Sequence, residues 1–445
     1  MKMILRVISL FLAVLMLLSC TGCSQNNYSS GDLVYGDPKA KDFLRILVDL
    51  LYINDINDMT LYNFAFSLQQ SGGLENFVLE TLPKTGVERK TAISRLNAEI
   101  MAGEGPDVFI LMSAQLQEGE RFIPFPEKVM ENGLFLPLDT YMENNSRFTN
   151  WDDQHQTVLA AGRNEEGQQI IPLSYTCPVV VYKQADLDVE KPDTLLTWND
   201  TLTDPKWKEI YVPVNDMRES VYVGGMFSGE VFWHLGSSAN LQYVVGRIAD
   251  FKEEKLLVTE EELTQRIKEI FALREKYPIT HKLGEEPYTE KYLSEEVSSK
   301  QYSAPITILP LYSDDGGITA SVTYYAAVNR NTRLPEDAFT VIDILMREST
   351  QLTSGLSGVV SGGYIPLNNN AFHPDHPFRL YYLKGASLDE LNDVREQITA
   401  VNFSTDLSVD IDVLLYKCEQ AYEKNEPIEE IIHETYENMQ RKLGE

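Results

Sequence analysis

The sequence predicts an α/β fold with a mainly parallel sheet, and residues 92–111 are the main reason. Apolar residues between Ala92 and Ile100 recur at the spacing of one helix face. Gly103 then stands where a helix ends in a left-handed cap. The apolar run 108–111 is typical of a buried strand. A helix that leads through a glycine turn into a buried strand is half of a βαβ unit, which indicates an α/β domain.

Further elements are expected along the chain. Residues 319–329 carry Ala320, Val322, Tyr324, Ala326 and Val328 at every second position, which places them on one face of a strand. Thr259 and Glu262 form a capping box at the start of an amphipathic helix, and Pro335 begins another helix. The chain closes with two amphipathic helices. The apolar runs 44–51 and 59–68 are compatible with either strand or helix.

The N-terminus, residues 1–23, is expected to be a lipoprotein signal peptide. Basic residues precede an apolar run, 7–18, that is too short to span a bilayer and suits a signal sequence. Cys20 and Cys23 follow this run, and either could be the acylated cysteine. An ordinary signal peptide with two incidental cysteines is the alternative.

Acylation would place the protein on the extracellular face of the cell membrane. Acyl chains such as palmitate stabilise membrane binding by about 0.8 kcal/mol per buried CH₂, and a stable anchor needs more than one chain. Residues 24–43 begin with a polar stretch rich in Asn, Ser and Gly, and we expect them to act as a flexible tether.

The composition argues against several classes of partner. A formal net charge of −29 disfavours binding to nucleic acid or to acidic lipids. The length of 445 residues is enough for two lobes with separate cores. Cys177 and Cys418 are expected to be buried thiols, although a disulfide between them stays open at this point.

The sequence contains no established catalytic motif of the common hydrolase or nucleotide-binding types. The patterns H-E-x-x-H, G-x-S-x-G and G-x-x-x-x-G-K-[ST] are all absent. His373 and His376 flank Pro374 and lack neighbouring ligands, so we expect a solvated loop there rather than a metal site. We therefore expect no enzymatic activity, no metal and no cofactor.

The amino-acid sequence of residues 95–109 resembles a segment of a known protein family. The stretch LNAEIMAGEGPDV resembles the "LN-x-E-I-x-A-G-x-G-P-D-V" segment of the extracellular solute-binding proteins, family 1, which supply ABC importers with sugars and related solutes. Other segments resemble landmarks of that family in the same order: 133–141, 171–183, 192–198, 302–311 and 361–368. Residues 33–90 fit the family poorly.

The resemblance implies a two-lobed periplasmic-binding-protein-like fold. Each lobe would be a mainly parallel sheet flanked by helices, and several strands would form a hinge. Lobe 1 would comprise 44–173 and 320–362, and lobe 2 would comprise 174–319 and 363–445. The chain would cross between lobes near Pro172, between Gly317 and Ser321, and near 362–364.

The resemblance also implies a function. The protein would be a monomeric receptor that binds a sugar or oligosaccharide between its lobes and delivers it to ABC permease subunits. Aromatic rings suit the flat faces of sugars, and the chain has 23 tyrosines. Candidate ligand contacts, taken from segments that resemble cleft loops, are Ser113, Gln115, Tyr175, Arg218, Tyr222, Trp233 and Tyr364.

Other functions remain open from the sequence alone. A surface-anchored glycoside hydrolase would need two carboxylates at a set spacing, which an acidic chain supplies in many combinations. An anchored esterase, an adhesion protein, and a receptor for peptides or other solutes are further alternatives.

Overall fold

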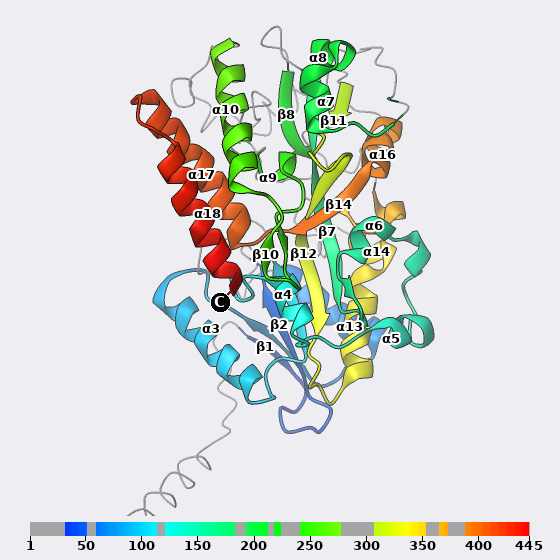
Figure 1. The fold of residues 1–445 in the computed structure, drawn as a ribbon. Helices are drawn as coiled ribbons and strands as arrows, with labels where there is room; N and C mark the ends of the chain where they lie inside the picture. The colour runs from blue at the N-terminus through cyan, green and yellow to red at the C-terminus, as the bar shows by residue number, and fades with distance from the viewer. Residues whose placement is uncertain are drawn as a thin grey trace, which may run out of the picture.

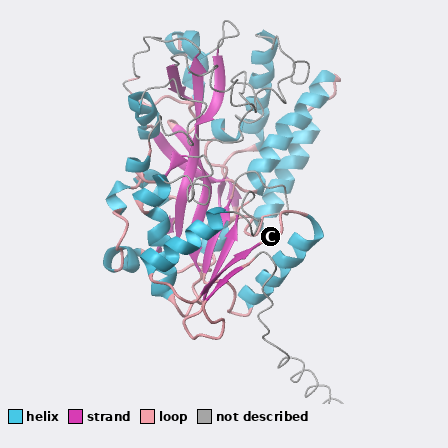
Figure 2. Cartoon of the chain, turned by 180° about the vertical axis from the view of Figure 1, so that it is seen from behind, coloured by secondary structure: helices cyan, strands magenta, loops and turns pink. Residues whose placement is uncertain are grey.

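The computed structural model describes residues 32–50, 59–113, 121–182, 192, 194–211, 218–223, 241–276, 307–352, 365–372 and 388–444. These residues form a mixed α/β structure around one large sheet of ten strands (Figure 1). Helices flank this sheet on both sides (Figure 2). The expected α/β class is confirmed.

The large sheet has the strand order β1-β3-β2-β4-β12-β7-β11, and three more strands pair with β7 or β12. Its strands are β1 (Leu33–Tyr35), β2 (Leu44–Asp49), β3 (Phe77–Thr81), β4 (Val108–Met112), β7 (Ile170–Tyr182), β8 (Arg218–Val223), β11 (Thr307–Pro310), β12 (Ile318–Val328), β13 (Ile365–Pro366) and β14 (Ile398–Phe403). The parallel pairings are β2–β3, β2–β4 and β12–β14, so the sheet is mixed. Two short hairpins pair β5 (Arg163–Asn164) with β6 (Gly167–Gln168), and β9 (Ala249–Asp250) with β10 (Lys255–Leu256).

The helices are distributed along the whole described chain. They are α2 (Met59–Ser67), α3 (Gly86–Met101), α4 (Pro126–Glu131), α5 (Asp139–Asn144), α6 (Gln156–Ala160), α7 (Trp198–Thr203), α8 (Pro205–Tyr211), α9 (Leu241–Val244), α10 (Glu260–Lys276), α13 (Pro335–Met346), α14 (Glu348–Leu352), α16 (Leu388–Glu396), α17 (Asp406–Glu423) and α18 (Glu429–Gly444). In Figure 1, α10, α17 and α18 lie to the left of the sheet, and α6, α13 and α14 lie to the right.

Two long strands run through both halves of the molecule. The first part of β7 pairs with β12 and β13, and its last residues, Cys177–Tyr182, pair with β8 and β11. Similarly, β12 pairs with β14 through Ile318–Val322 and with β4 through Tyr324–Val328. Chain segments that are remote in sequence therefore meet along β7 and β12.

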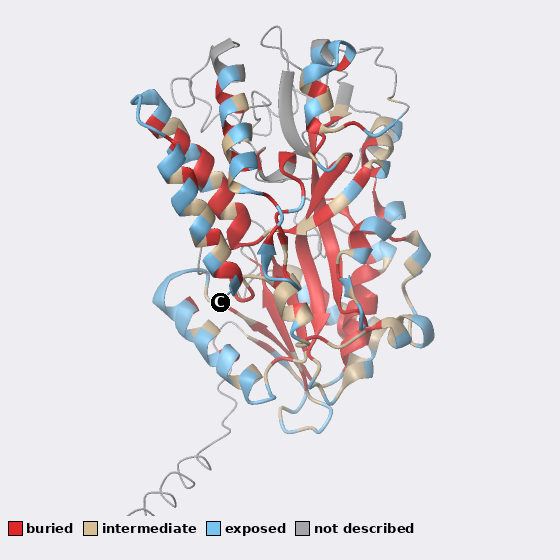
Figure 3. Cartoon of the chain, viewed as in Figure 1, coloured by how far each residue is buried: buried red, intermediate tan, exposed pale blue. Residues whose placement is uncertain are grey.

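The buried apolar side chains of the described residues fall into three clusters. The largest covers the sheet around β1 to β4, β12 and α13, and includes Phe64, Phe109 and Leu345. A second cluster joins α10, α17 and α18, and a third surrounds Trp198 and Tyr312. Figure 3 shows the buried central strands between more exposed helices. Helices α10, α17 and α18 thus pack around an apolar cluster of their own, whereas the largest cluster also includes Ile398, Val401 and Phe403 of β14.

Several expected elements are confirmed. The helix at 92–100 lies within α3, Gly103 has a φ of +80°, and β4 follows as the buried strand. The ambiguous runs resolve as strand β2 and helix α2. The expected helices at Thr259 and Pro335 and the two C-terminal helices are α10, α13, α17 and α18. Cys177 and Cys418 are both buried and unbonded.

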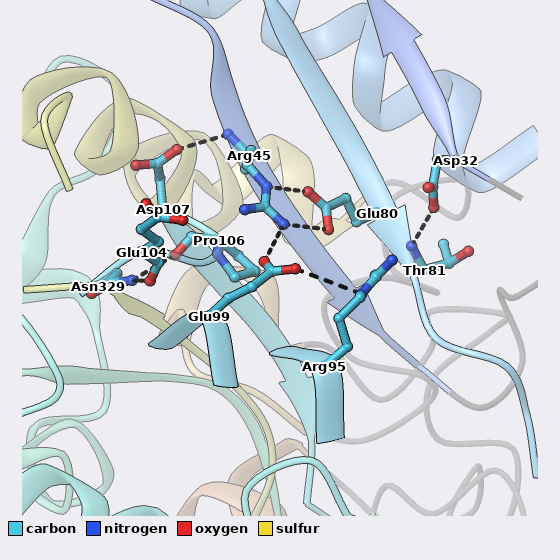
Figure 4. Close-up of polar contacts among 10 residues, drawn as sticks. All are labelled: Asp32, Arg45, Glu80, Thr81, Arg95, Glu99, Glu104, Pro106, Asp107 and Asn329. Atoms are coloured by element: carbon cyan, nitrogen blue, oxygen red, sulfur yellow. Dashed lines mark hydrogen bonds and ion pairs between the residues drawn. The ribbon is translucent and has the colours of Figure 1, made fainter. Parts of the chain in front are cut away.

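The turn at residues 105–107, in the segment that resembles the family motif, is held by a polar network at the amino end of β2 (Figure 4). The Asp107 carboxylate accepts hydrogen bonds from the Arg45 backbone N–H at 2.8 Å and from the Thr332 hydroxyl at 2.6 Å. Asn329 donates from its side chain to the Pro106 carbonyl at 3.0 Å. Gly105, at a φ of +101°, occupies the left-handed region that favours glycine. These hydrogen bonds connect the turn to β2 and to the residues that follow β12.

Some expectations lie outside the described residues. These are the signal peptide 1–23, residues 24–31 of the tether, the crossing near 362–364 and the loop with His373 and His376. Within the described part of the predicted tether, Leu33–Tyr35 forms strand β1 and pairs with β3 instead of remaining a flexible segment. Among the residues that the structure describes, no helix combines the length and the apolar character needed to cross a bilayer. The lobe boundaries at 173/174, 319/320 and 362/363 stay a prediction.

Candidate functional site

The carboxyl ends of β2 and β4 present a group of buried polar side chains. The strands are parallel neighbours, and Asp49 on β2, Leu111 on β4 and Tyr325 on β12 form one row across the sheet. Parallel sheets present ligand-binding groups at this edge. The polar residues here, which we call the edge cluster, are Asp49, Arg89, Ser113, Arg121, Tyr325 and Asp406.

Asp49 and Arg89 form a bidentate ion pair inside the N-terminal half. Arg89 on α3 donates to the two carboxylate oxygens of Asp49 at 2.8 and 2.7 Å, and it also donates to the Pro83 carbonyl at 3.0 Å. Only 1% of the Arg89 side chain is exposed. Burial raises the pKa of Asp49, and the hydrogen bonds and charge of Arg89 oppose that rise. The pair ties α3 to the end of β2.

Arg121 links the end of β4 to the start of α17. Its Nε donates to the Ser113 carbonyl at 3.1 Å, and its Nη1 donates to Asp406 at 2.5 Å. Burial lowers the pKa of Arg121, while Asp406 opposes that shift. The Nη2 group is buried and has no hydrogen-bond partner in the described structure. An unpartnered buried donor is costly, so this N–H group is suited to donate a hydrogen bond to a ligand oxygen.

Ser113 and Tyr325 lie beside these two ion pairs. The Ser113 hydroxyl donates to the Val322 carbonyl on β12 at 2.5 Å, and its backbone N–H donates to the Thr323 carbonyl at 2.9 Å. Burial raises the pKa of the Tyr325 phenol, the Asp49 carboxylate raises it further, and the Arg121 charge opposes both. Tyr325 is therefore within electrostatic reach of both pairs.

Tyr175 occupies a separate buried cluster on β7. Its side chain is fully buried, and its hydroxyl accepts a hydrogen bond from Arg395 Nε at 2.7 Å. His155 contacts the ring edge-on, with 5.5 Å between ring centroids. Burial raises the pKa of Tyr175 to about 12. In this arrangement the ring packs in the core instead of facing solvent, so a ligand would reach it only after local rearrangement.

The His155 imidazole is held neutral in the same cluster. Its Nδ1 accepts from the Val158 backbone N–H at 3.4 Å, so Nε2 carries the proton that it donates to the Arg395 carbonyl at 3.2 Å. Burial lowers the pKa of His155 to about 4, and the Arg395 charge lowers it further. Arg395 also donates to the Asn369 side chain at 2.6 Å. This cluster joins α6, β7 and α16.

The remaining candidate ligand contacts are distributed as follows. Arg218 and Tyr222 lie on β8, where their backbones pair with Tyr182 and Pro178 of β7. Gln115, Trp233 and Tyr364 lie outside the described residues, as do the candidate lipidation sites Cys20 and Cys23. Ser113 is the one candidate that the structure places in the edge cluster. The assignment of all seven residues to a ligand stays a prediction.

Sequence reasoning missed the charged members of the edge cluster. Asp49 lies within the apolar run 44–51 and is the last residue of β2, and an acid at the end of a buried strand is a signal that could have identified it. Arg121 and Asp406 are 285 residues apart, and no local pattern in the sequence connects them.

Comparison with known proteins identifies the fold. No protein-family model matches the sequence, and no curated protein matches it. A solved extracellular solute-binding protein of family 1 from Alicyclobacillus acidocaldarius is 12% identical, with a TM-score of 0.52, and the match covers 91% of this chain and 98% of that one. The fold is that of an extracellular solute-binding protein.

Other solved structures share this solute-binding-protein fold. A periplasmic oligogalacturonide-binding protein from Yersinia enterocolitica is 16% identical, with a TM-score of 0.51, over 90% of this chain and 98% of that one. A de novo designed cysteine esterase is 15% identical, with a TM-score of 0.53, over 91% of this chain and 99% of that one. At these identities the likeness establishes the fold alone.

Proposed function

We propose that this protein is a lipid-anchored receptor of an ABC importer that binds a sugar or oligosaccharide between its two halves. The observation that carries the proposal is that β7 and β12 each pair with different strands along their two ends, within a solute-binding-protein fold. Strands shared by two bodies can serve as a hinge, and ligand pockets occur preferentially at such interfaces.

A carbohydrate is the favoured solute. The Yersinia enterocolitica neighbour is described as an oligogalacturonide-binding protein, which supports a sugar ligand for the same fold. The 23 tyrosines supply rings for sugar faces, and the edge cluster supplies polar groups for hydroxyls. Permease subunits in other chains would receive the solute.

We propose that the residues that contact the sugar lie in the edge cluster and in the segments around it. Ser113, Gln115 and the unpartnered N–H of Arg121 would meet the solute at the end of β4. Tyr175, Arg218, Tyr222, Trp233 and Tyr364 would contribute from the second half and from the third crossing.

Thermal unfolding with a panel of oligosaccharides tests this proposal. A sugar at 100 times its dissociation constant should stabilise the folded protein by about 2.7 kcal/mol, because it binds the folded state alone. Small-angle scattering should show a more compact molecule with that sugar. An adhesion protein would show no such closure, and a panel without any stabilising sugar would contradict the carbohydrate assignment and favour peptides or other solutes.

Catalysis by cysteine is disfavoured by the surroundings of the two described thiols. Burial raises the pKa of both Cys177 and Cys418 to about 12, so neither is a thiolate at neutral pH. The shared fold with a designed cysteine esterase therefore does not extend to a nucleophile at these positions. Incubation with chromogenic esters and glycosides should give no turnover, and measurable turnover would favour the hydrolase alternative.

The anchor is tested separately. Changing Cys20 and Cys23 together to Ser should release the protein from membranes, because no acyl chain could then be attached. The two single variants should identify the acylated cysteine. Unchanged membrane retention of the double variant would contradict the lipoprotein assignment.

A further inference from the structure

A pocket lies between elements of the two predicted lobes, and none of its lining residues belongs to the edge cluster. It has a volume of about 460 Å³. One wall is formed by α4, α6 and the start of β5, and the other by residues 247–252 and 399–401. A volume of this size accommodates a small organic molecule.

Two of the basic side chains in this pocket form ion pairs with acidic residues outside it, whereas its acidic side chains have fewer partners of opposite charge. Arg163 pairs with Asp139 at 2.5 Å and Lys252 pairs with Glu165 at 2.6 Å, and both acidic partners lie outside the pocket lining. The pocket itself contains three carboxylates, Glu127, Glu131 and Asp250, and the guanidinium of Arg247. The local charge that remains for a ligand is therefore negative.

Glu127 is a largely enclosed carboxylate of this pocket. Only 13% of its side chain is exposed, and its ion pair with Arg247 is loose, at 3.7 Å, which exceeds a hydrogen-bond distance. Burial raises the pKa of Glu127 to about 8, Arg247 opposes that rise, and the charges of Glu131 and Asp250 add to it. At neutral pH this carboxyl group is mostly protonated, and a cation placed beside it would favour its ionised form.

The pocket also has an apolar surface. Met130 on α4, Phe251 and Val401 line it together with two alanines at the end of α6. Phe251 is fixed by Phe125, with 6.0 Å between ring centroids. Such a surface suits a short hydrocarbon chain. Among the described residues, no cluster of His, Cys, Asp and Glu is arranged to hold a metal ion.

We propose that this pocket binds a small organic amine, with its ammonium group between Glu127, Glu131 and Asp250 and its hydrocarbon part against Met130, Phe251 and Val401. The pocket combines carboxylates from both walls with an apolar floor, which matches the two parts of such a ligand. The site is independent of the proposed sugar site, so the two proposals can fail separately.

Hexylamine is the probe that tests the site, and hexanol and hexanoate are matched controls. The unliganded protein at pH 7 should show saturable binding of hexylamine by calorimetry and a raised melting temperature. Hexanol and hexanoate should bind at least tenfold more weakly, since neither carries a positive charge. Equal binding of hexylamine and hexanol, or no saturable binding of hexylamine, would overturn the proposal.

Glu127→Gln is the decisive variant. It should weaken hexylamine binding at least tenfold while leaving the melting temperature of the unliganded protein nearly unchanged, because the replaced carboxyl is already mostly neutral at pH 7. Glu143→Gln is the control, since it removes an exposed carboxylate of α5 outside the pocket lining and should leave binding unchanged. Wild-type affinity in Glu127→Gln would place the amine elsewhere and refute the site.

The pH dependence gives an independent readout. Hexylamine stays protonated at pH 9, as a lysine side chain does, whereas Glu127 becomes ionised between pH 7 and pH 9. Its affinity should therefore rise about tenfold over this range in the wild type and stay flat in Glu127→Gln. A flat profile in the wild type would contradict a role for Glu127.

Discussion

The two buried arginine–aspartate pairs of the edge cluster differ in the segments that they connect and in the number of hydrogen bonds that they form. Asp49 and Arg89 are 40 residues apart, lie in the same half of the molecule and form two charge-assisted hydrogen bonds. Arg121 and Asp406 are 285 residues apart, connect segments assigned to different lobes and form one such bond. One Nη group of Arg121 lacks a hydrogen-bond partner in the described structure.

This difference indicates a structural role for the Asp49–Arg89 pair and a role in ligand recognition or lobe movement for the Arg121–Asp406 pair. Taking a charge out of water costs several kcal/mol, and only good geometry with further hydrogen bonds offsets that cost. The Asp49–Arg89 pair meets this condition and would hold the sheet and α3 together in any lobe arrangement. The Arg121–Asp406 pair meets this condition only in part, because one Nη group of Arg121 lacks a hydrogen-bond partner in the described structure. A polar solute or a change in lobe position could supply that partner.

The largest effect is expected when the saturated pair is broken. Arg89→Met leaves the Asp49 carboxylate buried without its partner, and we expect a loss of roughly 3–5 kcal/mol in the free energy of unfolding. Urea denaturation measures this loss. Arg45→Met is a control, since that arginine pairs with Glu80 while 28% of its side chain stays exposed, and its loss should be smaller. A loss below 1 kcal/mol for Arg89→Met would refute the structural role.

Arg121→Met should destabilise the protein less than Arg89→Met, by about 1.5–3 kcal/mol. The variant removes the hydrogen bonds to Asp406 and to the Ser113 carbonyl, together with an N–H group that had no partner in the described structure. Asp406, in the first turn of α17, keeps a favourable interaction with the helix dipole. The same denaturation series measures the order, and an equal or larger loss for Arg121→Met would break the distinction between the two pairs.

The same contrast explains what the sequence could predict. Helix α3, the turn at Gly105 and strand β4 were predictable because their signals are local: an apolar period, a glycine stop and a buried run. The Arg121–Asp406 contact was not, because only the folded chain brings residues 285 positions apart together.

Tyr175 illustrates a second limit of sequence reasoning. Its place beyond the first crossing made it a candidate ligand contact, yet nothing in the local sequence specifies which way its ring points. The partner that covers its hydroxyl, Arg395, is 220 residues away.

A smaller effect is expected at His155, which like Arg121 joins remote segments. Its folded pKa lies below the unfolded value, so its contribution to stability is present above pH 6.5 and is lost as the pH falls towards 4. Because the ring is partly exposed, we expect a loss of about 1 kcal/mol between pH 7 and pH 5. His155→Asn, which keeps a capping group for α6, should show a shallower dependence in denaturation at both pH values. An unchanged slope would assign the acid sensitivity to another group.

The smallest effect is expected for Ser113→Ala, because this change leaves the contact with Arg121 intact. Arg121 binds the backbone carbonyl of Ser113, whereas the hydroxyl donates to the Val322 carbonyl on β12. Losing that single neutral hydrogen bond should reduce the free energy of unfolding by about 0.5–1.5 kcal/mol. If the two contacts are independent, Ser113→Ala and Arg121→Met should have additive effects in a double-mutant cycle. A coupling energy above about 0.5 kcal/mol would show that the hydroxyl also orients Arg121, and the end of β4 would then act as one unit with the interlobe pair.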